Sequence, residues 1–337
     1  MPQPKMSTFA LAWTTIIANC VVILQGAVVR ATGSGAGCGS HWPTCNGEII
    51  PLAPSTETMI EFSHRLLSLG VLILGAWLLR RAFRSRKTNP GLWVSAAAAF
   101  FFLIVEALLG AATVVLGLTA DNASVGRGLM VASHLVNSLL LIGTLTLTVV
   151  YARAKDTPWP LRVRRQGTLT TVLGVGFVGM LVLMFSGGIA AMGNTMFPSE
   201  SLRAGIAADF DPASHPLIRL RILHPLIAIG VGVYLFVSLG LGWWLKPVAQ
   251  AKRFAQALLG VYIVQLIIGT ANLALLAPIV LQLLHLMTAV LAFALLTAFA
   301  AYALGGEPSR TSTNPEPTPA PTLEPTLGTA RQVSKKI

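Results

Sequence analysis

Eight apolar segments, each long enough to cross a lipid bilayer, dominate this sequence. They comprise residues 9–29, 60–79, 92–116, 129–151, 169–192, 217–245, 254–277 and 279–304. An α-helix rises about 1.5 Å per residue, so roughly 20 apolar residues cross the hydrocarbon core of a bilayer. Lipid offers no hydrogen bonds to the backbone, whereas a helix satisfies its own backbone groups. We therefore predict an all-α integral membrane protein with eight transmembrane helices.

The composition agrees with a membrane protein. Hydrophobic residues make up 54% of the 337 residues and charged residues only 11%, which is too little charge to cover a soluble surface. The net charge of +12 would suit a nucleic-acid-binding protein, but the basic residues lie in short loops between the apolar segments. That distribution is typical of membrane topology rather than of a phosphate-binding face. Membrane lipid is the expected environment, and nucleic acid is excluded as a partner.

The basic residues also predict the orientation of the chain. Of the 24 Lys and Arg residues, all but six fall on one side of the predicted membrane; the six are Arg30, Arg65, Arg127, Arg203, Arg219 and Arg221. Because Lys and Arg are retained in the cytoplasm, we predict a multi-pass protein of the cell membrane with both termini cytoplasmic. Residues 305–337 are rich in Pro and Thr with a basic end, which predicts a disordered cytoplasmic tail.

The two halves of the chain resemble each other. Short blocks recur in the same order at the same helices, and they pair Gly26 with Gly187, His64 with His224, Glu106 with Gln265, and His134 with His285. An even number of helices in each half gives both halves the same orientation. We predict two pseudo-repeated four-helix bundles, residues 1–151 and 152–304.

Four of the six histidines fall inside predicted transmembrane helices, at a similar depth below the outer surface: His64, His134, His224 and His285. A single such histidine would suggest an interhelical hydrogen bond. Two in each half suggest heme, because imidazoles from facing helices of a bundle can ligate iron from both sides. A zinc or di-iron site would usually show more carboxylates. We predict that His64 pairs with His134 and His224 with His285.

The two halves differ beside these histidines. Glu61 lies three residues before His64 and so on the same helix face, whereas Arg221 occupies the corresponding position before His224. We therefore expect the reaction centre in the first half, with a helix-terminal acid as the alternative reading of Glu61. Arg65, Arg219 and Arg221 border the histidines and are candidates for binding heme propionates, or else interface anchors. The sequence assigns no role to Glu106 or to the loop 194–217.

The first outer loop holds two cysteines, Cys38 and Cys45, in an oxidising compartment. Glycines and a proline near them allow the chain to turn back and close a disulfide. Two roles remain open for this pair: a structural staple, or a redox-active pair that exchanges electrons with a thiol protein.

Taken together, these features resemble the heme A synthase family, over residues 9–304. The block Glu61-Phe62-Ser63-His64-Arg65 matches the family's Glu-x-x-His-Arg motif, and the other three histidines fill the remaining family positions. The outer loop matches at residues 25–35, Cys38, Trp42, Pro43 and Cys45. The cysteine pair is similar to that of the bacterial members with an outer-loop disulfide.

The resemblance implies an oxidoreductase that converts the C8 methyl of heme O to a formyl group, giving heme A for cytochrome oxidase. It implies heme O as the substrate near His64, His134 and Glu61. It also implies a permanent heme b cofactor on His224 and His285. Heme O synthase, and a quinone or thiol redox partner, are further partners that it suggests. The electron acceptor and the oligomeric state stay undetermined.

Two other functions fit parts of this pattern. A bis-histidine diheme cytochrome that passes electrons to or from quinone would need the same four histidines. Glu61 and the cysteine pair favour the enzyme over this carrier. A transporter built on a repeat is the other possibility, but it would not require two histidine pairs at one depth.

Overall fold

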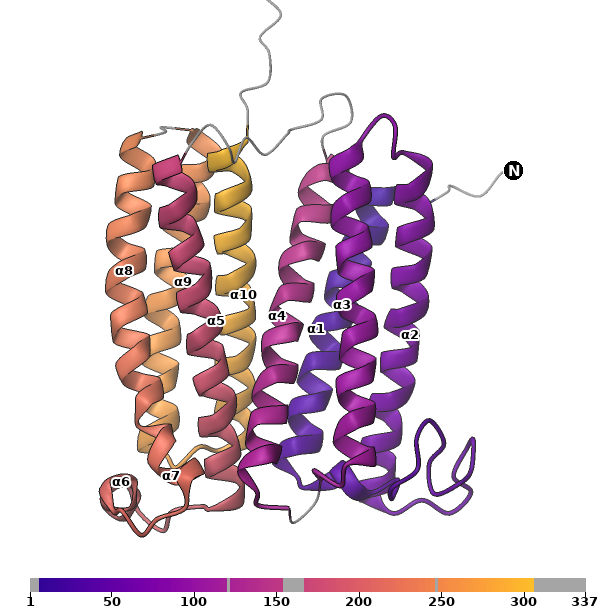
Figure 1. The fold of residues 1–337 in the computed structure, drawn as a ribbon, viewed down its shortest axis with the longest axis vertical. Helices are drawn as coiled ribbons and strands as arrows, with labels where there is room; N and C mark the ends of the chain where they lie inside the picture. Colours follow the sequence, from indigo (N-terminus) through magenta and orange to yellow (C-terminus); the bar gives the residue numbers. More distant parts are fainter. Residues whose placement is uncertain (1–5, 120–121, 154–166, 246–247, 306–337) are drawn as a thin grey trace, which may run out of the picture. The chain divides into compact units, whose positions relative to one another are not determined.

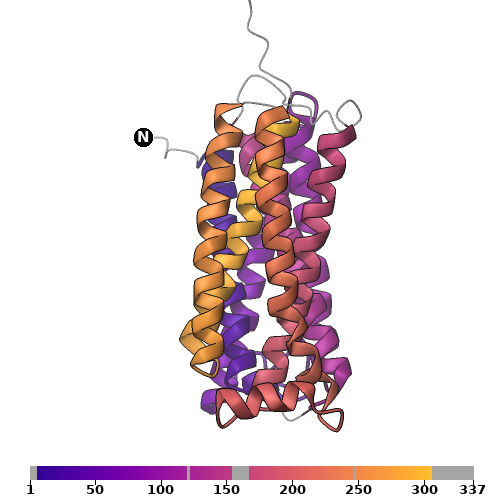
Figure 2. The same cartoon turned by 90° about the vertical axis from the view of Figure 1, so that its left-hand side faces the viewer.

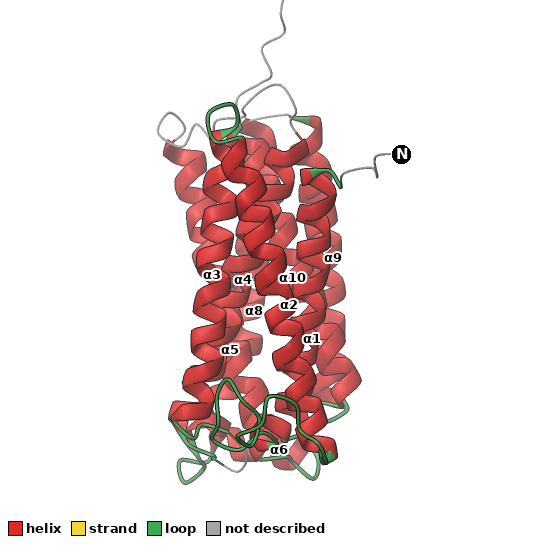
Figure 3. Cartoon of the chain, turned by 90° about the vertical axis from the view of Figure 1, so that its right-hand side faces the viewer, coloured by secondary structure: helices red, strands yellow, loops and turns green. Residues whose placement is uncertain are grey.

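The computed structural model describes residues 6–119, 122–153, 167–245 and 248–305, and every regular element in these ranges is a helix (Figure 3). Eight spans are long and apolar enough to cross a membrane. They are formed by α1 (Thr8–Ala31), α2 (Thr56–Arg84), α3 (Pro90–Val115), α4 (Val125–Arg153), α5 (Gly167–Met196), α7 (Pro216–Arg221) together with α8 (Leu223–Leu245), α9 (Ala249–Ala274) and α10 (Ile279–Leu304). The all-α prediction with eight membrane-spanning helices is therefore confirmed.

Capping residues explain where several helices begin. Ser7, Ser55 and Asn89 each accept a hydrogen bond from the backbone N–H three residues later, at the starts of α1, α2 and α3. These caps satisfy N–H groups that a helix leaves free in its first turn. The apolar pattern alone does not mark such ends, so α2 begins before and ends after the predicted segment 60–79.

The sixth predicted helix, residues 217–245, is interrupted. Its outer end is a short helix, α7 (Pro216–Arg221), which His215 caps, and α8 starts after a break at Ile222. Arg221 and His224 therefore lie on different helices, unlike Glu61 and His64, which share α2. The loop before α7 contains another helix, α6 (Leu202–Phe210), which the hydropathy pattern did not predict.

The described residues between 6 and 305 belong to one compact unit. Within it, α1 to α4 lie together and α5, α8, α9 and α10 lie together (Figures 1 and 2). α4 and α1 pack against α10, and α4 packs against α5. The loops that follow α1, α3, α5 and α9 lie at one end of the helices, called the outer end below (Figure 1). The tail after residue 305 lies outside the described residues. The pseudo-repeat, the two-bundle domain division and the cytoplasmic termini stay predictions.

The packed interior lies where the two groups of helices meet. Leu139 and Ile142 of α4 belong to one buried cluster with Met180 of α5 and with Phe293 and Leu296 of α10. At the outer end, a Cβ added at Gly188 would lie 2.7 Å from the Cα of Ala132, so only glycine permits this approach of α5 to α4. Large exposed apolar side chains, such as Ile73 and Phe236, cover the outside of the helices and suit contact with lipid.

Candidate functional site: two histidine pairs at the outer end

Each of the four intramembrane histidines faces a glycine on the preceding long helix. A Cβ added at Gly26, Gly187 or Gly269 would lie 3.0, 3.0 or 2.8 Å from the Cε1 atom of His64, His224 or His285, and one added at Gly110 would lie 3.6 Å from the Nε2 atom of His134. The missing side chains leave room for the imidazole rings between helices. Sequence comparison of the halves paired Gly26 with Gly187, but the contacts of these glycines with the histidines were not predicted.

His224 and His285 approach each other directly. Their ring centroids lie 6.1 Å apart and the planes cross at 83°. Imidazole nitrogens bind transition metals at about 2 Å, so this spacing leaves room for a single metal atom between the two rings. The Nδ1 atom of His224 lies 3.1 Å from the Oγ atom of Ser186, a contact that orients the ring. The structure thus brings together the pair that the sequence predicted in the second half.

His64 and His134 are the corresponding residues in the first half. His64 lies on α2 and faces Gly26 of α1. Its Nδ1 atom is buried and has no hydrogen-bond partner among the described residues. The Nδ1 atom of His134 contacts the Oε2 atom of Glu106 on α3. The sequence showed no partner for Glu106, because the contact depends on how α3 packs against α4.

The geometry fits heme better than a bare metal ion. In the described part of the chain, no group of three or more His, Cys, Asp or Glu side chains could hold a metal ion. A heme needs only two axial ligands because the porphyrin supplies four nitrogens. Two-histidine groups between helices provide that number.

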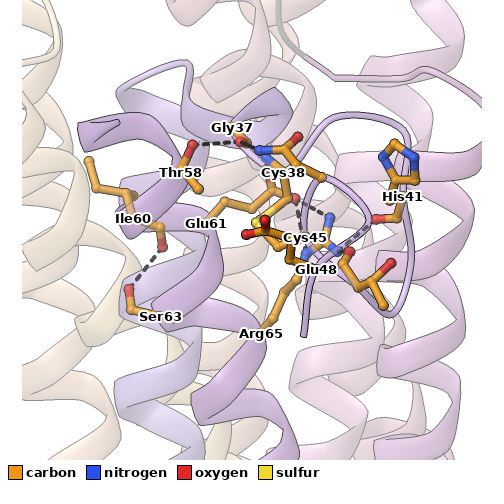
Figure 4. The surroundings of a disulfide bond; sticks show 12 residues. Gly37, Cys38, His41, Cys45, Glu48, Thr58, Ile60, Glu61, Ser63 and Arg65 are labelled. Atoms are coloured by element: carbon orange, nitrogen blue, oxygen red, sulfur yellow. Dashed lines mark hydrogen bonds and ion pairs between the residues drawn. A yellow bond between two sulfur atoms is a disulfide. The ribbon is translucent and has the colours of Figure 1, made fainter. Parts of the chain in front are cut away.

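The Glu61 carboxylate lies beneath the first outer loop (Figure 4). Its Oε2 atom accepts a 2.9 Å hydrogen bond from the backbone N–H of Cys38, and its Oε1 atom accepts bonds of 2.5 and 3.1 Å from Arg65. Only 4% of Glu61 is exposed. Both carboxylate oxygens therefore help to hold the loop, which the spacing of Glu61 and His64 did not indicate.

The predicted disulfide between Cys38 and Cys45 is present, and both residues are buried. The same loop is held further by Arg65, which donates to the backbone oxygens of His41 and Thr44. Thr58 at the start of α2 donates to the backbone oxygen of Gly37 (Figure 4). The disulfide, Glu61 and Arg65 therefore form one connected structure over the outer end of α2.

The three arginines predicted to bind propionates differ in their contacts. Arg65 donates hydrogen bonds to Glu61 and to the backbone oxygens of His41 and Thr44. Arg221 donates to Asp209, Asn194, Ser199 and the backbone oxygen of Gly205, which holds the loop containing α6. Arg219 is exposed, and its side chain makes no hydrogen bond to any described residue. Propionate binding by these residues stays a prediction.

Arg30, an outer arginine to which the sequence assigned no role, connects the two groups of helices. It donates to the backbone oxygen of Ala191 at 3.1 Å and to the Oγ1 atom of Thr195, both on α5. It also donates to the Oε1 atom of Gln282 on α10 at 2.7 Å. In the sequence, a basic residue at the end of an apolar segment indicates only an interface anchor. Its hydrogen-bond partners could not be inferred, because they lie on segments distant in the sequence.

Comparisons with known proteins support the resemblance seen in the sequence. Two proteins of Thermus thermophilus named protoheme IX farnesyltransferase are 42% and 43% identical to this chain, over 90% and 86% of its length. The matches cover 50% and 47% of those proteins, so the chain spans about half the length of these curated relatives. A heme A synthase of Halalkalibacterium halodurans is 35% identical over 51% of this chain and 52% of its own length.

A family model covers a larger part of the chain than that heme A synthase does. The model describes cytochrome oxidase assembly proteins and matches residues 9–297, which extend from α1 into α10 and include the four histidines. This chain therefore belongs to the cytochrome oxidase assembly protein family, COX15-CtaA.

Proposed function

We propose that this protein is a heme A synthase, which oxidises the C8 methyl group of heme O to a formyl group. The observation that carries the proposal is the set of two histidine pairs at the outer end. Among the described residues, only the first pair has a carboxylate, Glu106, within ion-pair distance of a histidine. Membership of the family and the similarity to a named heme A synthase support the same activity.

The two pairs have different proposed roles. His224 and His285, at 6.1 Å between ring centroids, would hold a permanent heme b. His64 and His134 would ligate the iron of heme O, with Glu106 and Glu61 nearby. Heme supplies the oxidising chemistry when bound. A substrate site needs groups that handle charge and protons, and these groups occur in the first half.

Glu61 is the proposed catalytic carboxylate. Its oxygens already accept hydrogen bonds from Arg65 and from the Cys38 amide. Taking up a proton from the substrate would require one of these bonds to break, so the geometry suits electrostatic stabilisation of positive charge better than proton storage. The same bonds keep the disulfide loop over the site, which would limit access of water.

The burial of the disulfide favours a structural role for Cys38 and Cys45. Exchange with a thiol protein requires attack on a sulfur atom, and access limits the rate. Cys38 and Cys45 are only 0% and 1% exposed. A quinone remains the alternative redox partner.

We also propose that heme O reaches this protein from a heme O synthase. The Thermus thermophilus relatives carry the name of a farnesyltransferase and are about twice as long as their match to this chain. A chain of that length has room for a farnesyltransferase and a heme A synthase. Two enzymes joined in one chain imply that one acts on the product of the other. The farnesyl tail of heme O would lie against the apolar, lipid-facing side of the helices.

Heme extraction tests the enzyme against a bis-histidine diheme cytochrome. Cells that make heme O are given the wild-type protein, His134→Ala or His41→Ala, and the extracted hemes are separated by chromatography. We expect heme A with the wild type and with His41→Ala, because His41 is exposed in the outer loop. His134→Ala should yield heme O without heme A. A wild type that contains heme b and makes no heme A from ample heme O would support the electron carrier instead.

A further inference from the structure

Glu106 is a buried acid with one polar contact. It lies on α3, and both carboxylate oxygens are buried. The only polar group that they approach among the described residues is the Nδ1 atom of His134. Burying a carboxylate away from water is costly unless it is paired. A helix that faces lipid would more easily carry an apolar residue here, so the contact with His134 needs an explanation.

The contact is fixed by the packing of α3 against α4. At the inner end, Asn89 donates a 2.9 Å hydrogen bond to the backbone oxygen of Tyr151. Nearer the outer end, Asn137 donates a 3.0 Å bond to the backbone oxygen of Phe102. Phe102 and Asn137 lie one turn from Glu106 and His134. These bonds set the register of the two helices and hold the acid opposite the histidine.

The second half has a different arrangement at the same positions. The side chain of Gln265, which aligns with Glu106, accepts a hydrogen bond from Thr288 on α10. The Nδ1 atom of His224 contacts a hydroxyl, and that of His64 has no hydrogen-bond partner in the described ranges. Among the four histidines in the part of the chain that the structure describes, His134 alone has a carboxylate within ion-pair distance.

We propose that Glu106 is a positioning residue for the substrate heme, acting through His134. Its carboxylate accepts the hydrogen bond from the Nδ1–H group of His134, which turns the Nε2 atom toward the iron and makes this histidine a stronger electron donor than the other three. The inference rests on the proposed function, because it requires a heme on His64 and His134.

Two consequences follow from the chemistry of such a contact. Metal-ligating histidines commonly donate their second ring N–H to a carboxylate, which fixes the tautomer and raises the basicity of the ligating nitrogen. A more basic ligand and a nearby negative charge both favour ferric over ferrous iron. The heme held by His134 therefore has a lower reduction potential than it would have with Gln at position 106.

The experiment uses the purified full-length protein loaded with ferric heme b as the probe, so that it does not depend on turnover of heme O. Redox titration followed by absorption should resolve two components, and the one that His134→Ala removes is the first-half heme. In Glu106→Gln, the amide oxygen still accepts the hydrogen bond but the charge is gone. At fixed potential, we expect the ferric-to-ferrous ratio of that component to fall at least tenfold relative to the wild type. This corresponds to a rise in reduction potential of about 59 mV for a one-electron couple.

Two further variants separate electronic from structural effects. Glu106→Ala removes the hydrogen-bond acceptor of His134. We expect this variant to bind heme in the first half about 10–100-fold more weakly than the wild type. Gln265→Glu makes the reverse change in the second half and should leave the first-half component unchanged. Equal potentials in wild type and Glu106→Gln would overturn the inference while leaving the proposed function intact. A wild type that shows no component dependent on His134 would overturn both.

Discussion

Glu61 illustrates how one residue can serve both a loop and a reaction. Its two oxygens receive hydrogen bonds from the Cys38 amide and the Arg65 guanidinium. An amide side chain has the same shape, but one of its two polar atoms is a donor, so it would face a donor from the protein. Substitution by Gln therefore removes the charge and one bond to the loop together.

We predict that Glu61→Gln lowers the yield of heme A by a factor of about 10²–10⁴ if the carboxylate handles a proton or developing charge. Loss of one bond to a buried group should cost about 1–3 kcal/mol of stability. Heme b content should stay at the wild-type level. The measurements are heme chromatography and thermal unfolding of the same preparations.

A matched control for this variant is Glu48→Gln in the same outer loop, where the exposed carboxylate accepts a hydrogen bond only from the Leu52 amide among the described residues. It should leave heme A unchanged. If Glu61→Gln makes as much heme A as this control, the carboxylate has no part in the reaction.

At the scale of helices, the glycine opposite each histidine determines whether a ring can fit between two neighbours. We predict that Gly187→Ala in α5 displaces the His224 ring, because the added Cβ would lie 3.0 Å from Cε1. Heme b content should fall and the visible spectrum should change. In the same helix, a Cβ at Gly174 meets nothing within 4 Å, so Gly174→Ala should keep full heme content and gain up to about 1 kcal/mol from helix propensity. Equal heme content in the two variants would contradict this role.

The helices were predictable because their signal is local. A run of about 20 apolar residues can be read without knowing its neighbours. The break at Ile222 was missed because the apolar segment 217–245 continues through it. Helix α6 was missed because its segment contains no apolar run of membrane-spanning length. The approach of His224 to His285 could be predicted from matched depth. The contact between Glu106 and His134 could not, since it depends on the register of α3 against α4.

At the scale of the whole molecule, Arg30 connects α1 to both α5 and α10. In the part of the chain that the structure describes, no carboxylate lies within ion-pair distance of its guanidinium. Its partners are a backbone oxygen, a hydroxyl and an amide oxygen. Hydrogen bonds from a charged group contribute about 1.5–3 kcal/mol each, so this residue is a substantial link between the two groups of helices.

We predict that Arg30→Ala lowers the midpoint of thermal unfolding and weakens heme retention in both histidine pairs, because Ala191, Thr195 and Gln282 lose a shared donor. Arg203→Ala is the control, since Arg203 is exposed in the outer loop. Calorimetry and heme release during heating measure the two effects.

If residues 1–151 and 152–304 fold as independent bundles, Arg30→Ala should separate one transition into two. If the halves unfold together, a single transition should shift to lower temperature. An unchanged midpoint with full heme retention would show that the contact between the halves does not depend on Arg30.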